Sequence, residues 1–107
     1  MPNAYEDPGP TRDEVDSWTG PAVLEFGADW CGYCQGARPA ITAALDAFPA
    51  IRHVKVADGK GKPLGRSFAV KLWPTLVFLK DGKEIARTVR PTDANEVRGG
   101  LEAISRS

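Results

Sequence analysis

The sequence predicts a single α/β domain with a central mixed sheet flanked by helices. Three observations lead to this fold class. The chain of 107 residues has single-domain size, apolar runs of strand length alternate with segments of helical spacing, and the last two runs are joined by a tight-turn sequence. The predicted order is α-β-α-β-α-β-β-α. Strands separated by helices and followed by a hairpin require a mixed sheet with helices on both faces.

The first half of the chain supplies two helices and two strands of this order. A capping-box pattern of Thr11 and Glu14 begins a short helix, which a glycine–proline pair ends. The run AVLEFGA, residues 22–28, has the length and apolar character of a buried strand. Apolar residues at helical spacing then predict an amphipathic helix to about residue 47. Alternation over IRHVKV, residues 51–56, predicts the second strand.

The second half supplies a short helix, a hairpin and a terminal helix. LGRSFAV, residues 64–70, reads as the short helix. The strands TLVFL (75–79) and EIARTV (84–89) flank a turn at Asp81-Gly82, which is a hairpin signal. A second capping-box pattern, starting at Asp93, begins the last helix.

Composition excludes several classes of protein. Acidic and basic residues balance at 14 each, which gives no electrostatic footprint for nucleic acid or an acidic membrane surface. The apolar runs are too short to span a bilayer, and the first residues lack the pattern of a signal peptide. We therefore expect a cytoplasmic protein, or a periplasmic one only if a leader has been removed. Residues 1–10, polar and rich in proline and glycine, predict a flexible N-terminal arm before a domain of residues 11–107.

The two cysteines, Cys31 and Cys34, form a CxxC motif at the predicted junction of strand and helix. A zinc site needs four ligands, and the chain adds a single histidine, His53, which we interpret as structural; no metal site is expected. A disulfide across so short a loop would stabilise the fold little. At a helix N-terminus, free N–H groups favour a thiolate at the first cysteine, and the second lies one turn further on. This arrangement favours a redox pair.

The segment VLEFGADWCGYCQGARPAI resembles the active-site segment of the thioredoxin superfamily, including a proline eight residues after Cys31. WPTLVFLKDGKEI resembles the cis-proline segment of that family and its following hairpin, and HVKV falls where the family has a strand with a lysine. The resemblance covers about residues 20–107. It implies a thioredoxin fold and a thiol–disulfide oxidoreductase, with a redox-active Cys31–Cys34 disulfide and no bound cofactor.

The resemblance also implies four catalytic residues. Cys31 would be the more exposed, attacking thiolate, and Cys34 the buried resolving thiol. Glu25 lies six residues before Cys31, where the family has a buried carboxylate beneath the second cysteine. Burial would raise the pKa of Glu25, so that it takes a proton from Cys34 near neutral pH. Lys55 would be its charge partner. The alternatives are that Glu25 and Lys55 are solvated residues of their strands.

A substrate-binding surface is implied by the same resemblance, made of Trp30, Gly32, Tyr33, Trp73, Pro74 and Arg90. Pro74 would be the cis proline that presents the backbone of Trp73 to a substrate strand. Tyr33 replaces the proline usual between the cysteines of thioredoxins, and Cys-Gly-Tyr-Cys resembles periplasmic disulfide isomerases. Trp73 is bulkier than the usual residue, and Arg90 stands where thioredoxins have glycine. Alternatively, Trp30 and Trp73 merely pack, and Arg90 points to solvent.

The function implied is reversible exchange with protein disulfide substrates through a mixed disulfide, by a protein expected to be a monomer. As a reductant it would receive electrons from a thioredoxin-reductase-like donor. Two alternatives stay open. One is a disulfide isomerase or oxidase of an oxidising compartment, and the other is a thioredoxin-fold binding module in which the CxxC is incidental.

Overall fold

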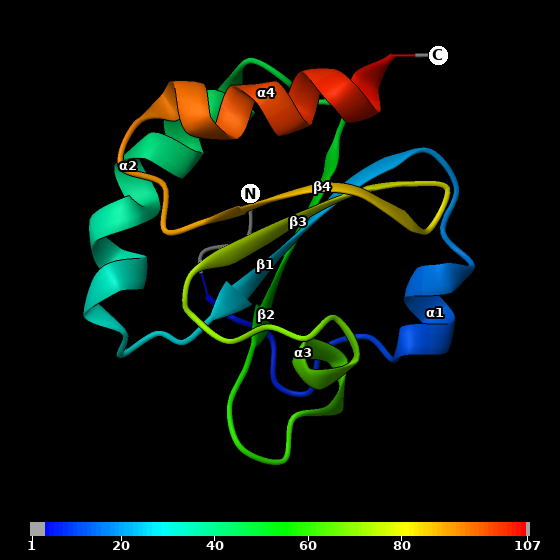
Figure 1. Ribbon diagram of the computed structural model, residues 1–107, viewed down its shortest axis with the longest axis vertical. Helices are drawn as coiled ribbons and strands as arrows, with labels where there is room; N and C mark the ends of the chain where they lie inside the picture. Colours follow the sequence, from blue (N-terminus) through cyan, green and yellow to red (C-terminus); the bar gives the residue numbers. More distant parts are fainter. Residues whose placement is uncertain (1–3, 107) are drawn as a thin grey trace.

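A computed structural model describes residues 4–106 of the chain, which form a four-stranded twisted sheet between two layers of helices (Figure 1). The strands are β1 (Pro21–Gly27), β2 (Arg52–Ala57), β3 (Thr75–Lys80) and β4 (Lys83–Val89). Their order in the sheet is β2-β1-β3-β4. β1 pairs with β2 in parallel and with β3 antiparallel, and β3 and β4 form the antiparallel hairpin. The predicted mixed sheet is confirmed.

Four helices cover the sheet in the predicted order. They are α1 (Arg12–Asp16), α2 (Gly32–Asp46), α3 (Pro63–Ser67) and α4 (Ala94–Ser105). α2 and α4 pack on one face, where apolar residues of both helices contact alternate residues of β1 and β3. α1 and α3 pack on the other face against the intervening residues. Because successive strand side chains point to opposite faces, β1 and β3 contribute to both cores and are buried except at Pro21 and Lys80.

Local sequence signals account for the ends of the elements. At α1, the Thr11 side chain accepts a hydrogen bond from the Glu14 N–H and the Glu14 side chain accepts one from the Thr11 N–H, which confirms the capping box. Asp93 caps α4, but the Glu96 carboxylate accepts from Thr92 rather than from the cap residue, so that second box is incomplete. The β3–β4 turn has positive φ at its aspartate and its glycine, as a tight hairpin requires.

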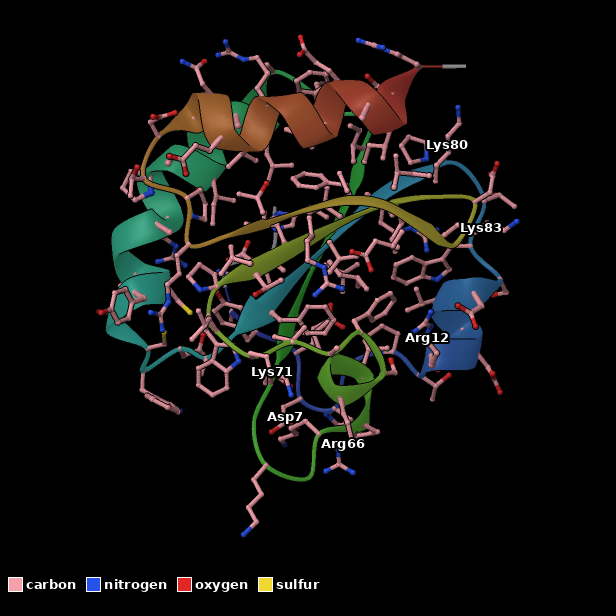
Figure 2. All side chains as sticks on the ribbon, in the orientation of Figure 1. Asp7, Arg12, Arg66, Lys71, Lys80 and Lys83 are labelled. Atoms are coloured by element: carbon pink, nitrogen blue, oxygen red, sulfur yellow. The ribbon has the colours of Figure 1, made fainter. Side chains whose placement is uncertain are left out.

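The N-terminal segment, whose composition predicts a flexible arm, makes contacts with the edge of the sheet. Residues 4–10 run beside β2, where the Glu6 N–H donates to the Lys55 carbonyl at 2.8 Å and the Glu6 carbonyl accepts from the Ala57 N–H at 2.9 Å. Asp7, beside the β2–α3 loop (Figure 2), accepts a hydrogen bond from Lys62 Nζ at 2.6 Å. The outer backbone groups of β2 provide the partners, and composition cannot reveal them. Residues 1–3 lie outside the described residues, and the domain boundary at residue 10 stays a prediction.

Candidate active site

The two cysteines lie at the junction that the sequence predicts, between the end of β1 and the start of α2. Both are free thiols. Cys31 is the N-cap of α2, and its Sγ accepts a hydrogen bond from the Cys34 N–H at 3.2 Å. Cys31 was expected to be clearly the more exposed, but the exposed fractions are 6% for Cys31 and 4% for Cys34. The difference between them is therefore one of chemical setting: Cys31 has the helix N-terminus, and Cys34 lies inside the first turn.

The thiol of Cys34 is a weak acid in this position. Burial, and next the hydrogen bond to Cys31, raise the pKa of Cys34 from 9.0 to about 11, against smaller lowering effects of the Ala28 backbone and the Tyr5 hydroxyl. At neutral pH the Cys34 thiol is therefore protonated, and it must lose this proton before its sulfur can attack.

Glu25 lies within β1 with 3% of its surface exposed, so the solvated alternative is excluded. Its Oε1 lies 2.8 Å from His53 Nε2, and its Oε2 accepts a hydrogen bond from the Tyr5 hydroxyl at 2.7 Å. Burial raises the pKa of Glu25, but the hydrogen bonds from His53 and Tyr5, together with the charges of His53 and Lys55, outweigh burial and lower it. The expectation of a raised pKa is wrong, because two of these partners were not foreseen.

His53 is the first partner that sequence reasoning missed, since we interpreted it as structural. β1 and β2 pair in parallel, with Glu25 opposite Lys55. His53 stands two residues before Lys55 and therefore lies on the same face of β2. That alternation was a usable signal in the sequence. Among the described residues, His53 Nδ1 is buried without a hydrogen-bond partner, so the histidine is held in the site by Glu25 alone through its other nitrogen.

Tyr5 is the second missed partner, and no sequence signal pointed to it because it lies in the N-terminal arm. Its backbone N–H donates to Asp29 Oδ1 at 3.2 Å, and its side chain packs against the cluster of Ala28 and the two cysteines. Lys55 is buried, and its Nζ lies 4.4 Å from the centre of the Tyr5 ring. Lys55 is therefore not a solvated strand residue, and it contributes its charge beside Tyr5 and Glu25.

Trp30 and Tyr33 are next to the cysteines in the sequence, and Trp73, which precedes a cis proline, packs against the cysteine cluster. The Trp73–Pro74 peptide bond is cis, as the resemblance implies. Trp30 is 76% exposed and meets Trp73 edge-on, with ring centres 5.5 Å apart. Tyr33 is 64% exposed. The residues expected to form the substrate surface are thus brought together, with Gly32 beside them in a position where an added Cβ would meet nothing within 4 Å.

The Arg90 side chain contacts Tyr33 and Trp73 of this surface instead of pointing to solvent. Its guanidinium lies 3.7 Å from the centre of the Tyr33 ring, and its Nε donates to the Trp73 carbonyl at 2.8 Å. Its backbone N–H donates to the Pro74 carbonyl at 2.9 Å, and its φ of 51° lies in the left-handed region that favours glycine. Trp73 also donates from Nε1 to Asp58 Oδ2 at 2.9 Å. The Trp73 carbonyl, which a substrate strand would use, is therefore already engaged by Arg90.

A polar cavity of about 180 Å³ borders the dithiol, lined by Tyr5, Ala28, Asp29, Cys34, Gln35, Arg38 and Lys55. Within residues 4–106 there is no group of three histidine, cysteine or acidic side chains able to hold a metal ion. Over the same residues, no helix is long and apolar enough to cross a membrane.

The CxxC dithiol lies at a helix N-terminus, the residue before a cis proline packs against the cysteine cluster, and a buried carboxylate lies on the preceding strand. These features define the class of protein-disulfide oxidoreductases. The family model described as Thioredoxin matches residues 11–103. The chain belongs to the thioredoxin family.

Known relatives agree with this assignment. The structure of reduced thioredoxin 2 from Pseudomonas aeruginosa superposes with a TM-score of 0.87 and 48% identity, covering 98% of this chain and 97% of that one. A thioredoxin of Chlamydia trachomatis is 32% identical over 80 residues, which are 74% of this chain and 78% of the relative. Thioredoxin H2 of Arabidopsis thaliana is 39% identical over 67 residues, which are 63% of this chain but only 50% of that longer relative.

Proposed function

We propose that this oxidoreductase reduces protein disulfides through a mixed disulfide, with Cys31 as the attacking and Cys34 as the resolving residue. The observation that carries the proposal is the contrast between the two thiols. Cys31 Sγ is the cap of α2 and receives an N–H hydrogen bond, which stabilises negative charge on that sulfur. Cys34 is buried and its pKa is raised to about 11, so it is inert until its proton is removed.

The reaction has two steps. The Cys31 thiolate attacks one sulfur of a substrate disulfide, and the other substrate sulfur leaves with the bond's electron pair. Cys34, after losing its proton, then attacks Cys31 Sγ, which releases the second substrate thiolate and forms the Cys31–Cys34 disulfide. Two electrons pass to the substrate, and no further cofactor takes part. Regeneration of the dithiol requires an external donor, for which we propose a thioredoxin-reductase-like protein of the cytoplasm.

Trapping variants test the assignment. Cys34→Ser should form mixed disulfides with its substrates and accumulate them, because attack is intact and resolution is lost. Cys31→Ser should form none, because the remaining thiol is buried and protonated. Both adducts are read by intact-mass spectrometry after incubation with a disulfide-containing protein. Adducts on Cys31→Ser but not on Cys34→Ser would contradict the assignment.

The unusual Cys-Gly-Tyr-Cys sequence favours one second candidate, a disulfide isomerase or oxidase. A comparison of initial rates separates the two functions: reduction of an intact protein disulfide against reshuffling of a scrambled one. Faster reshuffling than reduction, at equal protein concentration, would favour the isomerase. A normally reducible dithiol that turns over neither substrate would favour a binding module instead.

A further inference from the structure

The second step of the proposed reaction needs a route for the Cys34 proton. Glu25 is the buried carboxylate of the site, but among the described residues no hydrogen bond joins it to Cys34. Its Oε1 is occupied by His53 Nε2 at 2.8 Å. Its Oε2 is occupied by the Tyr5 hydroxyl at 2.7 Å. Because the Tyr5 hydroxyl already donates to Oε2, it offers a direct route by which a proton can reach that oxygen.

Gly27, the last residue of β1, shows how close the hydroxyl and the thiol lie. A Cβ placed on Gly27 would be 2.5 Å from Cys34 Sγ and 2.8 Å from the Tyr5 hydroxyl oxygen. The two groups thus converge over one point of the backbone that has no side chain. Tyr5 also packs against the cluster formed by Ala28 and the two cysteines. The Tyr5 hydroxyl therefore lies between the thiol and the carboxylate. The absence of a side chain at Gly27 leaves room for both the hydroxyl and the thiol.

We propose that Tyr5 is a catalytic residue that passes the proton of Cys34 to Glu25 during release of the substrate. The inference rests on the proposed exchange reaction. The Cys34 S–H bond breaks, its proton goes to the Tyr5 oxygen, and the Tyr5 O–H proton goes to Glu25 Oε2. The sulfur keeps the S–H electron pair and uses it to bond Cys31 Sγ, while the substrate sulfur leaves with the pair of the broken disulfide. Tyr5 ends neutral and Glu25 ends protonated.

The surroundings of Tyr5 favour a concerted transfer. Burial, and next the charge of Glu25, raise the pKa of Tyr5, so a free phenolate does not accumulate and the two protons move together. Transfer from Cys34 to Glu25 is uphill at rest, because the pKa of Cys34 is about 11 and that of Glu25 is lowered. Attack on Cys31 drives it, because bond formation removes the negative charge from the Cys34 sulfur. When the donor regenerates the dithiol, Glu25 returns its proton to Cys34 by the reverse of the same transfer.

Charged and titratable groups face the relay from each element packed around it. They are Glu25 on β1, His53 and Lys55 on β2, Asp29 in the β1–α2 loop, and Cys31 and Arg38 on α2. His53 holds Oε1, which leaves Oε2 as the acceptor, and the Lys55 charge beside the ring favours negative charge on the oxygens. The polar cavity bordering Tyr5 supplies the competing route, since water within it offers another proton path.

Tyr5→Phe tests the relay because it removes the hydroxyl and keeps the ring. Single-turnover reaction with a protein disulfide, quenched with acid and analysed by mass, separates formation of the mixed disulfide from its resolution. We expect formation to be unchanged and resolution to slow by more than about tenfold, since general acid–base catalysis typically contributes about 10²–10⁴-fold. The mixed disulfide should accumulate, and the rate of resolution should rise about tenfold per pH unit as free thiolate replaces the relay. Glu25→Gln, which removes the acceptor and keeps its shape, should show the same split.

The matched control is Asp7→Asn, which breaks the ion pair of the arm with Lys62 but keeps the Tyr5 hydroxyl. Both steps should keep the wild-type rates in this variant. A Tyr5→Phe variant that resolves within tenfold of wild type, or that slows both steps equally, would overturn the relay in favour of cavity water or a purely structural tyrosine. Absence of any mixed disulfide in the wild-type protein would instead contradict the proposed function.

A measurement on the unchanged protein keeps the inference testable even if the variants fold poorly. The resolution rate is measured in mixtures of H₂O and D₂O. Two protons in flight predict a rate that falls along a curve as the deuterium fraction rises. A straight line would indicate one moving proton and would contradict the relay through Tyr5.

Discussion

Glu25→Gln tests whether the surroundings of Glu25 stabilise its charged form or its neutral form. The substitution keeps the shape of the side chain and removes its charge. In the wild-type protein the carboxylate accepts hydrogen bonds at 2.7 Å from Tyr5 and 2.8 Å from His53, and the pKa of Glu25 is lowered although burial alone raises it. Its partners therefore stabilise the charged form by more than burial costs, and the neutral amide should be the less stable occupant at neutral pH.

The magnitude follows from the two hydrogen bonds. A bond to a charged group contributes about 1.5–3 kcal/mol and a neutral one about 0.5–1.5 kcal/mol, so exchanging both loses about 2–3 kcal/mol. The uncharged glutamine no longer carries the desolvation cost of a buried charge, and this offsets part of the lost stability. We expect Glu25→Gln to lower the free energy of unfolding by about 1 kcal/mol at pH 7, which corresponds to a decrease in Tm of roughly 4–8 °C for a domain of this size.

The pH dependence gives the same test a second readout. Because the folded-state pKa of Glu25 is lowered from 4.5, its contribution to stability is fully present above about pH 4.5 and is lost as the pH falls through the folded value. Glutamine has no such titration. Urea unfolding of both proteins, with the dithiol kept reduced, should therefore show a difference in stability at pH 7 that narrows as the pH falls below about 4.5.

One result would refute this reasoning. A Glu25→Gln protein more stable than wild type at pH 7 would mean that burial outweighs the partners and that the pKa of Glu25 is raised. In that case the wild-type protein would gain stability relative to the variant as the pH falls, which is the opposite slope.

Three further predictions concern the dithiol and the surface around it. The reduction potential, measured by equilibration with glutathione, should lie between about −270 and −180 mV, and Tyr33→Pro should lower it; a wild-type value at or below −270 mV would contradict this. Arg90→Gly combined with Trp73→Ile should raise the rate on bulky protein disulfides but not on small ones, because it frees the carbonyl of residue 73 and replaces two large side chains with smaller ones; equal effects on both substrates would refute a role in access. Gly27→Ala should lower the free energy of unfolding by about 1–3 kcal/mol in urea, because its methyl group would lie 2.5 Å from Cys34 Sγ; unchanged stability would show that this region yields.

Much of the fold could be predicted from the sequence because its determinants are local. The apolar run before the cysteines forms β1, and the Asp81-Gly82 pair forms the β3–β4 turn, each from a few adjacent residues. The placement of Cys31 at the start of a helix follows in the same way from strand, motif and helix in succession. The family resemblance then supplied the cis bond before Pro74, which no local pattern indicates.

The electrostatic network could not be predicted because it depends on contacts between distant segments. Tyr5 and Glu25 are 20 residues apart, and His53 and Glu25 are 28 apart. The first contact depends on the path of the arm along β2, and the second on the register of β2 against β1. The burial of Glu25 was foreseeable from its apolar neighbours, but the direction of its pKa shift depends on partners that only the assembled sheet reveals.

The bridge between Glu6 and Val56 has a consequence for aggregation. β2 lies at the edge of the sheet, and an open edge strand is a template for pairing with strands of other molecules. Glu6 occupies the Lys55 carbonyl and the Ala57 N–H on this edge. The opposite edge, β4, is protected by charged side chains instead: Lys83 (Figure 2), Glu84 and Arg87. Proteolytic removal of the arm would thus leave β2 as the unguarded edge, and intermolecular strand pairing would begin there.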